Sequence, residues 1–291
     1  MTMRHQLKTH PCFSEEAHLK YGRIHLPVSP SCNIQCAFCR RGINKTDQVP
    51  GCTNRVLSPE EALIILGKAL ELCPEIRVAG VAGPGDTLAT DHAFRTFLLI
   101  KEQYPQILRC LSTNGLLLRE RIEQIKEAEI NSLTVTVNSI TPEIQNEINE
   151  FVVYNNQVLR GIEAQKLLIE AQLLGIRRVA SETDAVVKIN TVLIPGLNDG
   201  EIGSIAKAAK EAGAVIHNII PLIPQQRMAD RPKPNCEELH AARIASMPYL
   251  DVFHHCKHCR ADAAGVMGKN HDISAQLYGE ERPVQDIFSH G

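Results

Sequence analysis

Short runs rich in Val and Ile alternate with amphipathic stretches along most of this 291-residue chain, and this alternation limits its fold more than any other feature. Six candidate strands lie at 23–28, 76–82, 106–112, 132–138, 186–194 and 214–222. Helical periodicity fills the intervals at 59–72, 91–104, 117–129, 141–150, 158–174 and 201–212. Such apolar runs suit strands that are buried on both faces. The order predicts an α/β protein of roughly six βα units with a parallel sheet.

A parallel sheet of this kind is either an open doubly wound sheet or an incomplete barrel, and the sequence leaves both open. In both, the loops at the carboxyl ends of the strands meet at one edge and carry the functional groups. The first helix has a clear start, because Ser58 precedes it and Glu61 follows three residues later, as in a capping box. Residues 23–223 form the repeat. We expect 1–22 and 224–291 to be extensions that fold back on it rather than separate domains.

Charge and hydropathy exclude several kinds of partner. The formal net charge is −2 and the basic residues are scattered, so neither a nucleic-acid groove nor an anionic membrane surface is indicated. The N-terminal stretch lacks the apolar core of a signal peptide, and no apolar run is long enough to span a membrane. We therefore expect a cytoplasmic protein. Its ten cysteines then favour metal ligation or redox chemistry over disulfides.

Three of these cysteines, Cys32, Cys36 and Cys39, follow the first strand with the spacing C-x3-C-x2-C. A 4Fe–4S cluster has four irons, and cysteinate is their usual ligand. Three thiolates leave one iron open to a substrate or cofactor, as a catalytic zinc site keeps an open position. The alternatives are a zinc knuckle or free core thiols, but a zinc site would need a fourth Cys or His nearby.

This spacing, with Phe38 before the last cysteine, resembles the signature of the radical S-adenosylmethionine (SAM) superfamily. The resemblance implies a partial (βα)6 barrel in which the open iron chelates the amino and carboxylate groups of SAM. Reduction of the cluster then cleaves SAM and releases a 5′-deoxyadenosyl radical. The segment VAGPGD, residues 81–86, matches the glycine-rich stretch that in this family receives the methionine amino group. The expected fold is thus a radical SAM partial barrel with N- and C-terminal cluster-binding extensions.

A closer resemblance, to the NifB family in its short form without a NifX-like domain, extends from about residue 10 to residue 268. It rests on the segments HPCFSEEAHLKYGRIHLPVSPSCNIQC, VAGPGDTLA, LSTNGLLL, VTVNSITPE, VLIPGLND and HCKHCRADAAGVMG. It implies an enzyme that fuses two 4Fe–4S substrate clusters, K1 and K2, around a SAM-derived carbide with an added sulfur. The product is the eight-iron precursor of the nitrogenase cofactor. Implied partners are cluster donors, an electron donor such as a ferredoxin or flavodoxin, and downstream cofactor carriers.

The resemblance also implies ligands for the two substrate clusters. For K2 they are Cys12, Cys256 and Cys259; from the residues alone, the C-x2-C pair with its neighbouring histidines could instead be a zinc half-site. For K1 the candidates are Cys52, Cys110 and His25, with a hydrogen-bonded strand histidine as the alternative for His25. The chain departs from the family here, because Thr46 stands where members usually have a cysteine. We interpret Cys52 as a displaced replacement.

The candidates for binding SAM are the residues of the glycine turn, as the resemblance implies, and polar residues at strand ends. These are Gly83, Gly85, Asp86, Ser112, Asn114, Asn138, Lys188 and Asn190. Several could equally be helix caps, and Lys188 could lie at a solvated strand end or contact a cluster.

Two other functions remain open at this stage. One is a different radical SAM enzyme with auxiliary clusters, for example a peptide-modifying one. The other is a non-enzymatic iron–sulfur scaffold or carrier, which would need neither the glycine turn nor the barrel.

Overall fold

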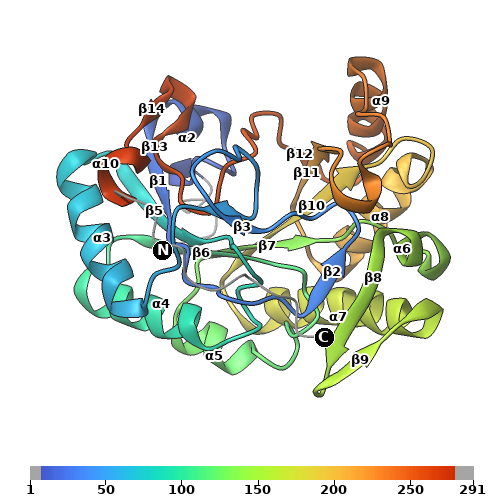
Figure 1. The fold of residues 1–291 in the computed structure, drawn as a ribbon, viewed down its shortest axis with the longest axis horizontal. Coiled ribbons are helices and arrows are strands. Elements are labelled where there is room, and N and C mark those ends of the chain that lie inside the picture. Colours follow the sequence, from blue (N-terminus) through green and yellow to red (C-terminus); the bar gives the residue numbers. More distant parts are fainter. Residues whose placement is uncertain (1–7, 279–291) are drawn as a thin grey trace.

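A nine-stranded sheet organises the chain in the computed structural model, which describes residues 8–278 (Figure 1). All six predicted strands are present, with bounds that differ by a few residues. They are β1 (Gly22–His25), β5 (Ile76–Val81), β6 (Leu108–Thr113), β7 (Ser132–Thr136), β10 (Val186–Leu193) and β11 (Ile216–Pro221). They lie side by side in chain order and pair in parallel. Since this order never reverses, the sheet is the incomplete barrel rather than the doubly wound arrangement.

Helices connect the successive barrel strands, and they lie around the outside of the curved sheet (Figure 1). They are α3 (Pro59–Leu72), α4 (His92–Gln103), α5 (Ile122–Glu127), α6 (Pro142–Ile148), α7 (Gly161–Glu182) and α8 (Ile202–Ala212). The predicted capping box of α3 is confirmed: Ser58 Oγ accepts from Glu61 N at 3.1 Å, and Glu61 Oε2 accepts from Ser58 N at 2.9 Å. Such caps stabilise a helix by about 1 kcal/mol.

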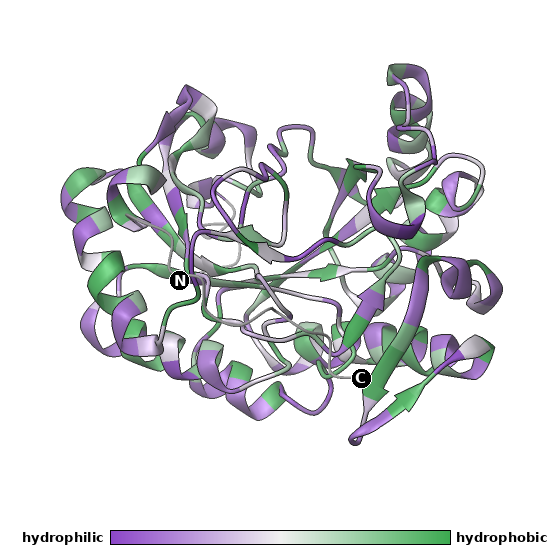
Figure 2. Cartoon of the chain, in the orientation of Figure 1, coloured by the Kyte–Doolittle hydropathy of each residue, from purple (hydrophilic) through white to green (hydrophobic). Residues whose placement is uncertain are grey.

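The apolar faces of these helices and the sheet enclose the main core. Its largest fully buried side chains include Phe97 on α4, Leu66 on α3 and Leu111 on β6. Figure 2 shows the same division, with mostly hydrophobic strands and helices that alternate between hydrophobic and hydrophilic residues. The barrel therefore rests on ordinary apolar burial, which leaves its open mouth free for polar groups.

Three helix predictions were wrong at their ends. The helix predicted at 117–129 spans only Ile122–Glu127. The helix predicted at 158–174 continues past Gly175 to Glu182. Gly175 is there for close packing and not as a helix end, because a Cβ on it would lie 2.7 Å from Leu118 Cβ. The predicted helix at 141–150 ends at Ile148, and a strand begins at the next residue.

That strand is part of a hairpin that the periodicity did not predict. β8 (Asn149–Tyr154) and β9 (Gln157–Leu159) pair in antiparallel fashion around Asn155 and Asn156, both with positive φ. Two such residues between β-rich runs are typical of a tight hairpin turn. β8 also pairs with β2 (Ile34–Cys36), so the hairpin supports the segment that carries the clustered cysteines.

The two extensions join the barrel sheet. β13 (Ala264–Val266) pairs antiparallel to β1, β14 (His271–Asp272) pairs with β13, and β12 (Asp251–Val252) lies parallel to β11 at the other edge. The other named α-helices and strands are α2 (Glu15–Lys20), α9 (Cys236–Ser246), α10 (Ser274–Tyr278) and a short pair, β3 (Gly42–Ile43) and β4 (Cys52–Thr53). Domain boundaries at residues 22 and 223 stay predictions. None of the helices described here is both long and apolar enough to cross a membrane.

A buried histidine ties the last barrel strand to its neighbours. His217 on β11 is fully buried, with Nδ1 2.9 Å from Ser246 Oγ on α9 and Nε2 2.9 Å from Thr191 Oγ1 on β10. Burial lowers the pKa of this imidazole to about 3. His217 is therefore neutral in the native state at pH values where an unfolded histidine, with a pKa near 6.5, takes up a proton.

We expect this difference in pKa to lower the free energy of unfolding as the pH decreases below about 6.5. Between pH 6.5 and about 3 the unfolded state binds the extra proton, so the free energy of unfolding drops by up to about 1.4 kcal/mol per pH unit from His217 alone. The variant His217→Gln should be less stable at pH 7 but lose stability less steeply toward pH 5. Urea unfolding of cluster-free protein at several pH values measures both; equal slopes in the two proteins would contradict the assignment.

Candidate functional site

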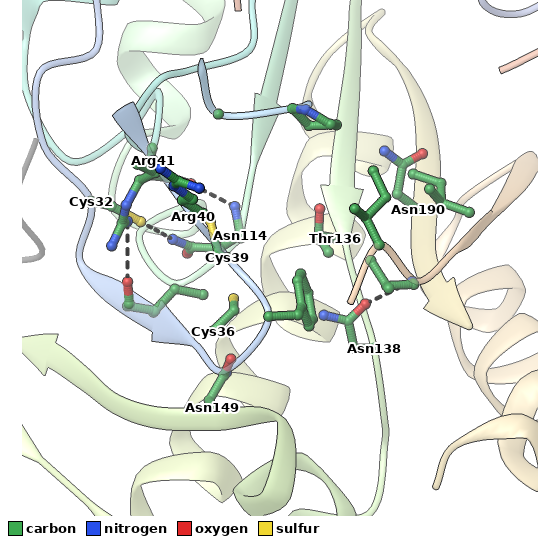
Figure 3. Close-up of a pocket in the computed structure, with 18 of the residues that line it drawn as sticks. Cys32, Cys36, Cys39, Arg40, Arg41, Asn114, Thr136, Asn138, Asn149 and Asn190 are labelled. Carbon is green, nitrogen blue, oxygen red and sulfur yellow. Dashed lines mark hydrogen bonds between the residues drawn. The ribbon is translucent and has the colours of Figure 1, made fainter. Parts of the chain in front are cut away.

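A cavity of about 270 Å³ opens at the carboxyl ends of the barrel strands, and the three clustered cysteines line it. Cys32, Cys36 and Cys39 come from the loop after β1, and Figure 3 shows them on one side of the cavity with Asn138 and Asn190 on the other. Cys32 is buried, and the other two are partly buried. The structure thus brings the predicted cysteines together with five of the predicted SAM-binding residues, which are Gly85, Asp86, Asn114, Asn138 and Asn190.

Backbone pairing holds the cysteine loop against the glycine turn after β5. Gly85 N donates to Ser29 O at 2.8 Å, and Asp86 N donates to Ser31 O at 2.9 Å. The approach is so close that a Cβ on Gly85 would lie 2.0 Å from Ser31 O. Only glycine fits here, so the turn sets the position of the residue just before Cys32. Gly83, also part of this turn, has a φ of +128° and packs against the C-terminal extension at Ala261.

Asp86 lines the cavity, but its carboxylate is engaged by the end of β6. It accepts hydrogen bonds from Asn114 N at 2.6 Å, from Leu88 N at 2.9 Å and from Thr113 Oγ1 at 3.0 Å. Burial raises the pKa of Asp86, while the hydrogen bonds from Asn114, Leu88 and Thr113 oppose that rise. These contacts hold Asn114, whose Nδ2 lies 2.6 Å from Asn33 Oδ1 and 3.9 Å from Cys32 Sγ.

Buried thiols in this cavity favour a bound cation. Burial raises the pKa of Cys32 to about 11 and that of Cys36 well above its ordinary value, and the neighbouring sulfurs add to both shifts. The Arg41 guanidinium acts in the opposite direction on all three thiols. Since iron provides the positive charge that makes such thiols ionise, the three residues fit an iron–sulfur cluster.

The remaining wall of the cavity contains residues that the sequence did not single out. Besides Arg41 they include Asn149, at the start of β8, and Gln172 on α7, whose Nε2 donates to Asn114 O at 2.8 Å. The side-chain oxygen of Asn138 already has a partner within the protein, because Oδ1 accepts a hydrogen bond from Val192 N at 2.9 Å. A search for polar residues at the ends of predicted strands could not have found Asn149 and Gln172. Asn149 lies on the unpredicted hairpin, and Gln172 lies in the interior of a helix.

A second cavity of about 230 Å³ lies deeper in the barrel and contains most of the other predicted ligands. The predicted residues that line it are Cys12, Cys110, Cys256, Cys259, His25, Ser112, Lys188 and Asn190. Ser112 and Lys188 thus face this cavity and not the first one. The unpredicted residues include two aromatic rings, Phe13 and Phe253, whose centroids lie 4.8 and 5.5 Å from Lys188 Nζ.

His25 and Cys110 are aligned across the floor of this second cavity. In the strand register His25 on β1 pairs with Gly80 on β5, and Gly80 pairs with Cys110 on β6. The two ligand candidates are therefore two strands apart, about 10 Å between their Cα atoms. Because Gly80 has no side chain, the His25 ring can lie over it, with Cδ2 3.4 Å from where a Cβ would stand. Burial raises the pKa of Cys110 to about 11 and lowers that of His25 to about 3.

Cys52 is placed apart from these residues. It is fully buried at the start of β4, with its Sγ 4.0 Å from Arg40 O, and it is not among the residues that line either cavity. Thr46 is exposed on the same loop and hydrogen-bonds Asn44. The assignment of Cys52 as a K1 ligand stays a prediction, and this geometry gives it no support.

The thiols of each cavity do not converge on one point. Within residues 8–278, no three His, Cys, Asp or Glu side chains lie close enough together to hold a single metal ion. A four-iron cluster does not require such convergence, because each iron takes its own ligand. The two cavities adjoin and share Pro50, Ala82, Asn190 and Ile220 in their walls.

Comparison of the sequence with known proteins gives a consistent set of relatives. A profile described as "Radical SAM superfamily" matches residues 26–209. The "FeMo cofactor biosynthesis protein NifB" of Methanocaldococcus infernus is 44% identical over 285 residues, which cover 97% of this chain and 93% of that protein. The protein of the same name from Klebsiella pneumoniae is 38% identical, and the match covers 90% of this chain but 57% of that longer protein.

Solved structures support the fold. A radical SAM methyltransferase from Sphaerobacter thermophilus superimposes with a TM-score of 0.57 at 16% identity, covering 79% of this chain and 64% of that one. Methylornithine synthase (PylB) gives a TM-score of 0.53 at 14% identity, covering 99% and 75%. At such identities the likeness concerns the fold alone, an α/β radical SAM barrel.

The contact between the glycine turn and the cysteine loop leads to a prediction. In Gly85→Ala the new Cβ must displace Ser31 O, so we expect a loss of stability of about 1–3 kcal/mol and a loss of the cluster bound by the adjacent cysteines. Iron counting after anaerobic reconstitution and a thermal melt measure the two effects. Gly200→Ala is the control, because a Cβ on Gly200 would have no atom within 4 Å. Wild-type iron content in Gly85→Ala would contradict the prediction.

Proposed function

This chain belongs to the NifB family of radical SAM proteins, and we propose that it fuses two 4Fe–4S substrate clusters into the eight-iron precursor of the nitrogenase cofactor. The proposed reaction inserts a SAM-derived carbon as the central carbide and incorporates one added sulfur. One SAM would donate the methyl carbon, and a second would be the source of the 5′-deoxyadenosyl radical.

The observation that best supports this proposal is the pair of adjoining cavities. The first contains three cysteines and the glycine turn, and the second contains four more cysteines and His25. A radical enzyme with a small organic substrate needs only the first set of thiols. A second, cysteine-rich cavity that shares walls with the first is suited to a substrate that is itself an iron–sulfur cluster.

In the first cavity the residues of the chain bind and orient SAM. A 4Fe–4S cluster held by Cys32, Cys36 and Cys39 would supply the electron that cleaves SAM. We propose that the turn at Gly83–Asp86 and the side chains of Asn114 and Asn138 hold the polar groups of SAM. Asp86 would act by positioning Asn114, since its oxygens accept hydrogen bonds from the end of β6.

In the second cavity we propose that Cys12, Cys256 and Cys259 hold K2, and that Cys110 and His25 hold K1. His25 is suited to bind a metal through Nε2, because the proton of its neutral ring is on Nδ1. Its Nδ1 lies 3.0 Å from Arg260 O, so Nδ1 carries the proton and Nε2 keeps its lone pair for a metal. The low pKa of His25, caused by burial and by Arg23, keeps the ring neutral at neutral pH.

Asn190 and Ile220 line both cavities, so they lie where a SAM-derived carbon would reach a substrate cluster. Apolar side chains such as Phe13, Phe253 and Ile220 would exclude water and oxygen from the reacting sulfides. We further propose that the protein works in the cytoplasm. There it would receive clusters from iron–sulfur donors and electrons from a ferredoxin or flavodoxin, and would pass its product to cofactor carriers.

Anaerobic reconstitution followed by iron counting and SAM cleavage under dithionite tests the proposal. We expect about twelve irons per chain, for three four-iron clusters, with S-adenosylhomocysteine and 5′-deoxyadenosine as products. A radical SAM enzyme with electron-transfer clusters would bind extra iron but form no S-adenosylhomocysteine. A cluster carrier would cleave no SAM, and four irons per chain would rule out the proposed reaction.

The ligands of K1 can be tested separately by single substitutions. We expect Cys110→Ala to lower the iron content by about four per chain, because Cys110 lines the second cavity, and Cys52→Ala to leave it unchanged. Cys73→Ala is the matched control, since Cys73 is a fully buried thiol at the end of α3. Iron counts on all three variants measure the effects. A loss of iron in Cys52→Ala would show instead that the 44–54 loop moves to bring this thiol to the cluster.

A further inference from the structure

The second cavity contains a buried arginine that the proposed reaction has not yet used. Arg23 on β1 is 5% exposed, and its Nη2 donates a hydrogen bond to Cys259 Sγ. Its strand partner is Gly265 on β13, in the C-terminal extension. The guanidinium therefore lies where the barrel meets the C-terminal extension that carries Cys256 and Cys259. Figure 1 shows the two strands involved, β1 and β13, side by side.

One nitrogen of this guanidinium has no hydrogen-bond partner within residues 8–278. Arg23 Nη1 is buried and makes no hydrogen bond to any of the described residues. A buried N–H of a charged group is costly when it is left unsatisfied, so such atoms in native proteins usually face a ligand. Arg23 is among the residues that line the second cavity.

The charges around the cavity support the same conclusion. Of the residues described, no aspartate or glutamate lines the second cavity, whereas Arg23, Lys188 and Lys257 all do. Lys188 is largely satisfied, because its Nζ donates to Cys12 O at 3.1 Å and lies over two aromatic rings. Arg23 thus provides buried positive charge beside the sulfurs of Cys259, Cys12 and Cys256, and its Nη1 still has a donor for an anion.

A second buried arginine in the same sheet shows how this fold satisfies a purely structural guanidinium. Arg109 on β6 is 4% exposed. Its Nε donates to Ala128 O at 2.9 Å, its Nη1 donates to Ile107 O at 3.2 Å, and its Nη2 lies 3.6 Å from Glu129 Oε2. It lines neither cavity. Arg109 has carbonyl and carboxylate partners throughout, and the contrast with Arg23 is what points to a ligand.

We propose that Arg23 is a binding residue for the anionic substrate cluster held by Cys12, Cys256 and Cys259, to which Nη1 donates a hydrogen bond while Nη2 holds Cys259. This inference rests on the function proposed above and adds one contact to it. An iron–sulfur cluster with thiolate ligands carries net negative charge, and its sulfides accept hydrogen bonds. The planar fork of arginine can reach a ligand thiolate and a cluster sulfide at the same time.

The test compares wild type with Arg23→Gln, Arg23→Lys and the matched control Arg109→Gln, all reconstituted anaerobically. Irons per chain are counted after gel filtration, release of iron to a chelator is timed, and 5′-deoxyadenosine formation from SAM reports on the first cavity. We expect Arg23→Gln to lose about four irons per chain, one cluster, while its 5′-deoxyadenosine formation shows whether the cluster of the first cavity is still bound. Arg109→Gln should melt at a lower temperature but keep the wild-type iron content.

Arg23→Lys decides the matter if Arg23→Gln does not fold. Lysine keeps the charge but lacks the fork, so we expect full iron loading with about tenfold faster release to the chelator. Wild-type iron content and release in the folded Arg23 variants would overturn the inference and leave the proposed function standing. Four irons in the wild-type protein would overturn the proposed function itself.

Discussion

Two backbone hydrogen bonds, from Gly85 N to Ser29 O and from Asp86 N to Ser31 O, are the contact on which the site depends. They fix the loop that bears Cys32 to the turn after the neighbouring strand. The Asp86 carboxylate then accepts a hydrogen bond from Asn114 N at the end of the next strand. Gln172 on α7 adds the last contact, because its Nε2 donates to Asn114 O. Three successive strand ends are thus linked, which gives a long cysteine loop a defined position at the mouth of an open barrel.

The two cavities differ in how they are built. The first is made by loops at the carboxyl ends of the strands, as in other parallel α/β folds. The second uses side chains from the strands themselves, such as His25 and Cys110, and is covered by the two extensions that bear Cys12 and Cys259. Each contains a guanidinium near its thiols, Arg41 in the first and Arg23 in the second. A buried arginine beside each group of thiols provides positive charge that offsets negative charge on the sulfurs within an apolar barrel.

Much of the fold could be predicted from the sequence because its signals are local. The Val/Ile-rich runs located all six barrel strands, and Ser58 with Glu61 located the start of α3 to the residue. The hairpin at Asn149–Leu159 was missed since the preceding helical pattern continued into it, although the two asparagines at its turn were a usable signal. Local patterns also could not separate Lys188 and Ser112 from the SAM candidates. Which cavity a strand residue faces depends on how deep it lies in the barrel, and that depth comes from tertiary structure.

The hydrogen bond between Arg23 and Cys259 joins residues 236 positions apart in the chain. During synthesis the barrel strands emerge from the ribosome well before the segment that contains Cys256 and Cys259, because chains are made from the N-terminus. The first cavity can therefore form while the second is still incomplete. The order of translation thus sets an order of assembly, because the cysteine loop and the strand residues His25 and Cys110 are in place before the segment with Cys256 and Cys259 can close the second cavity.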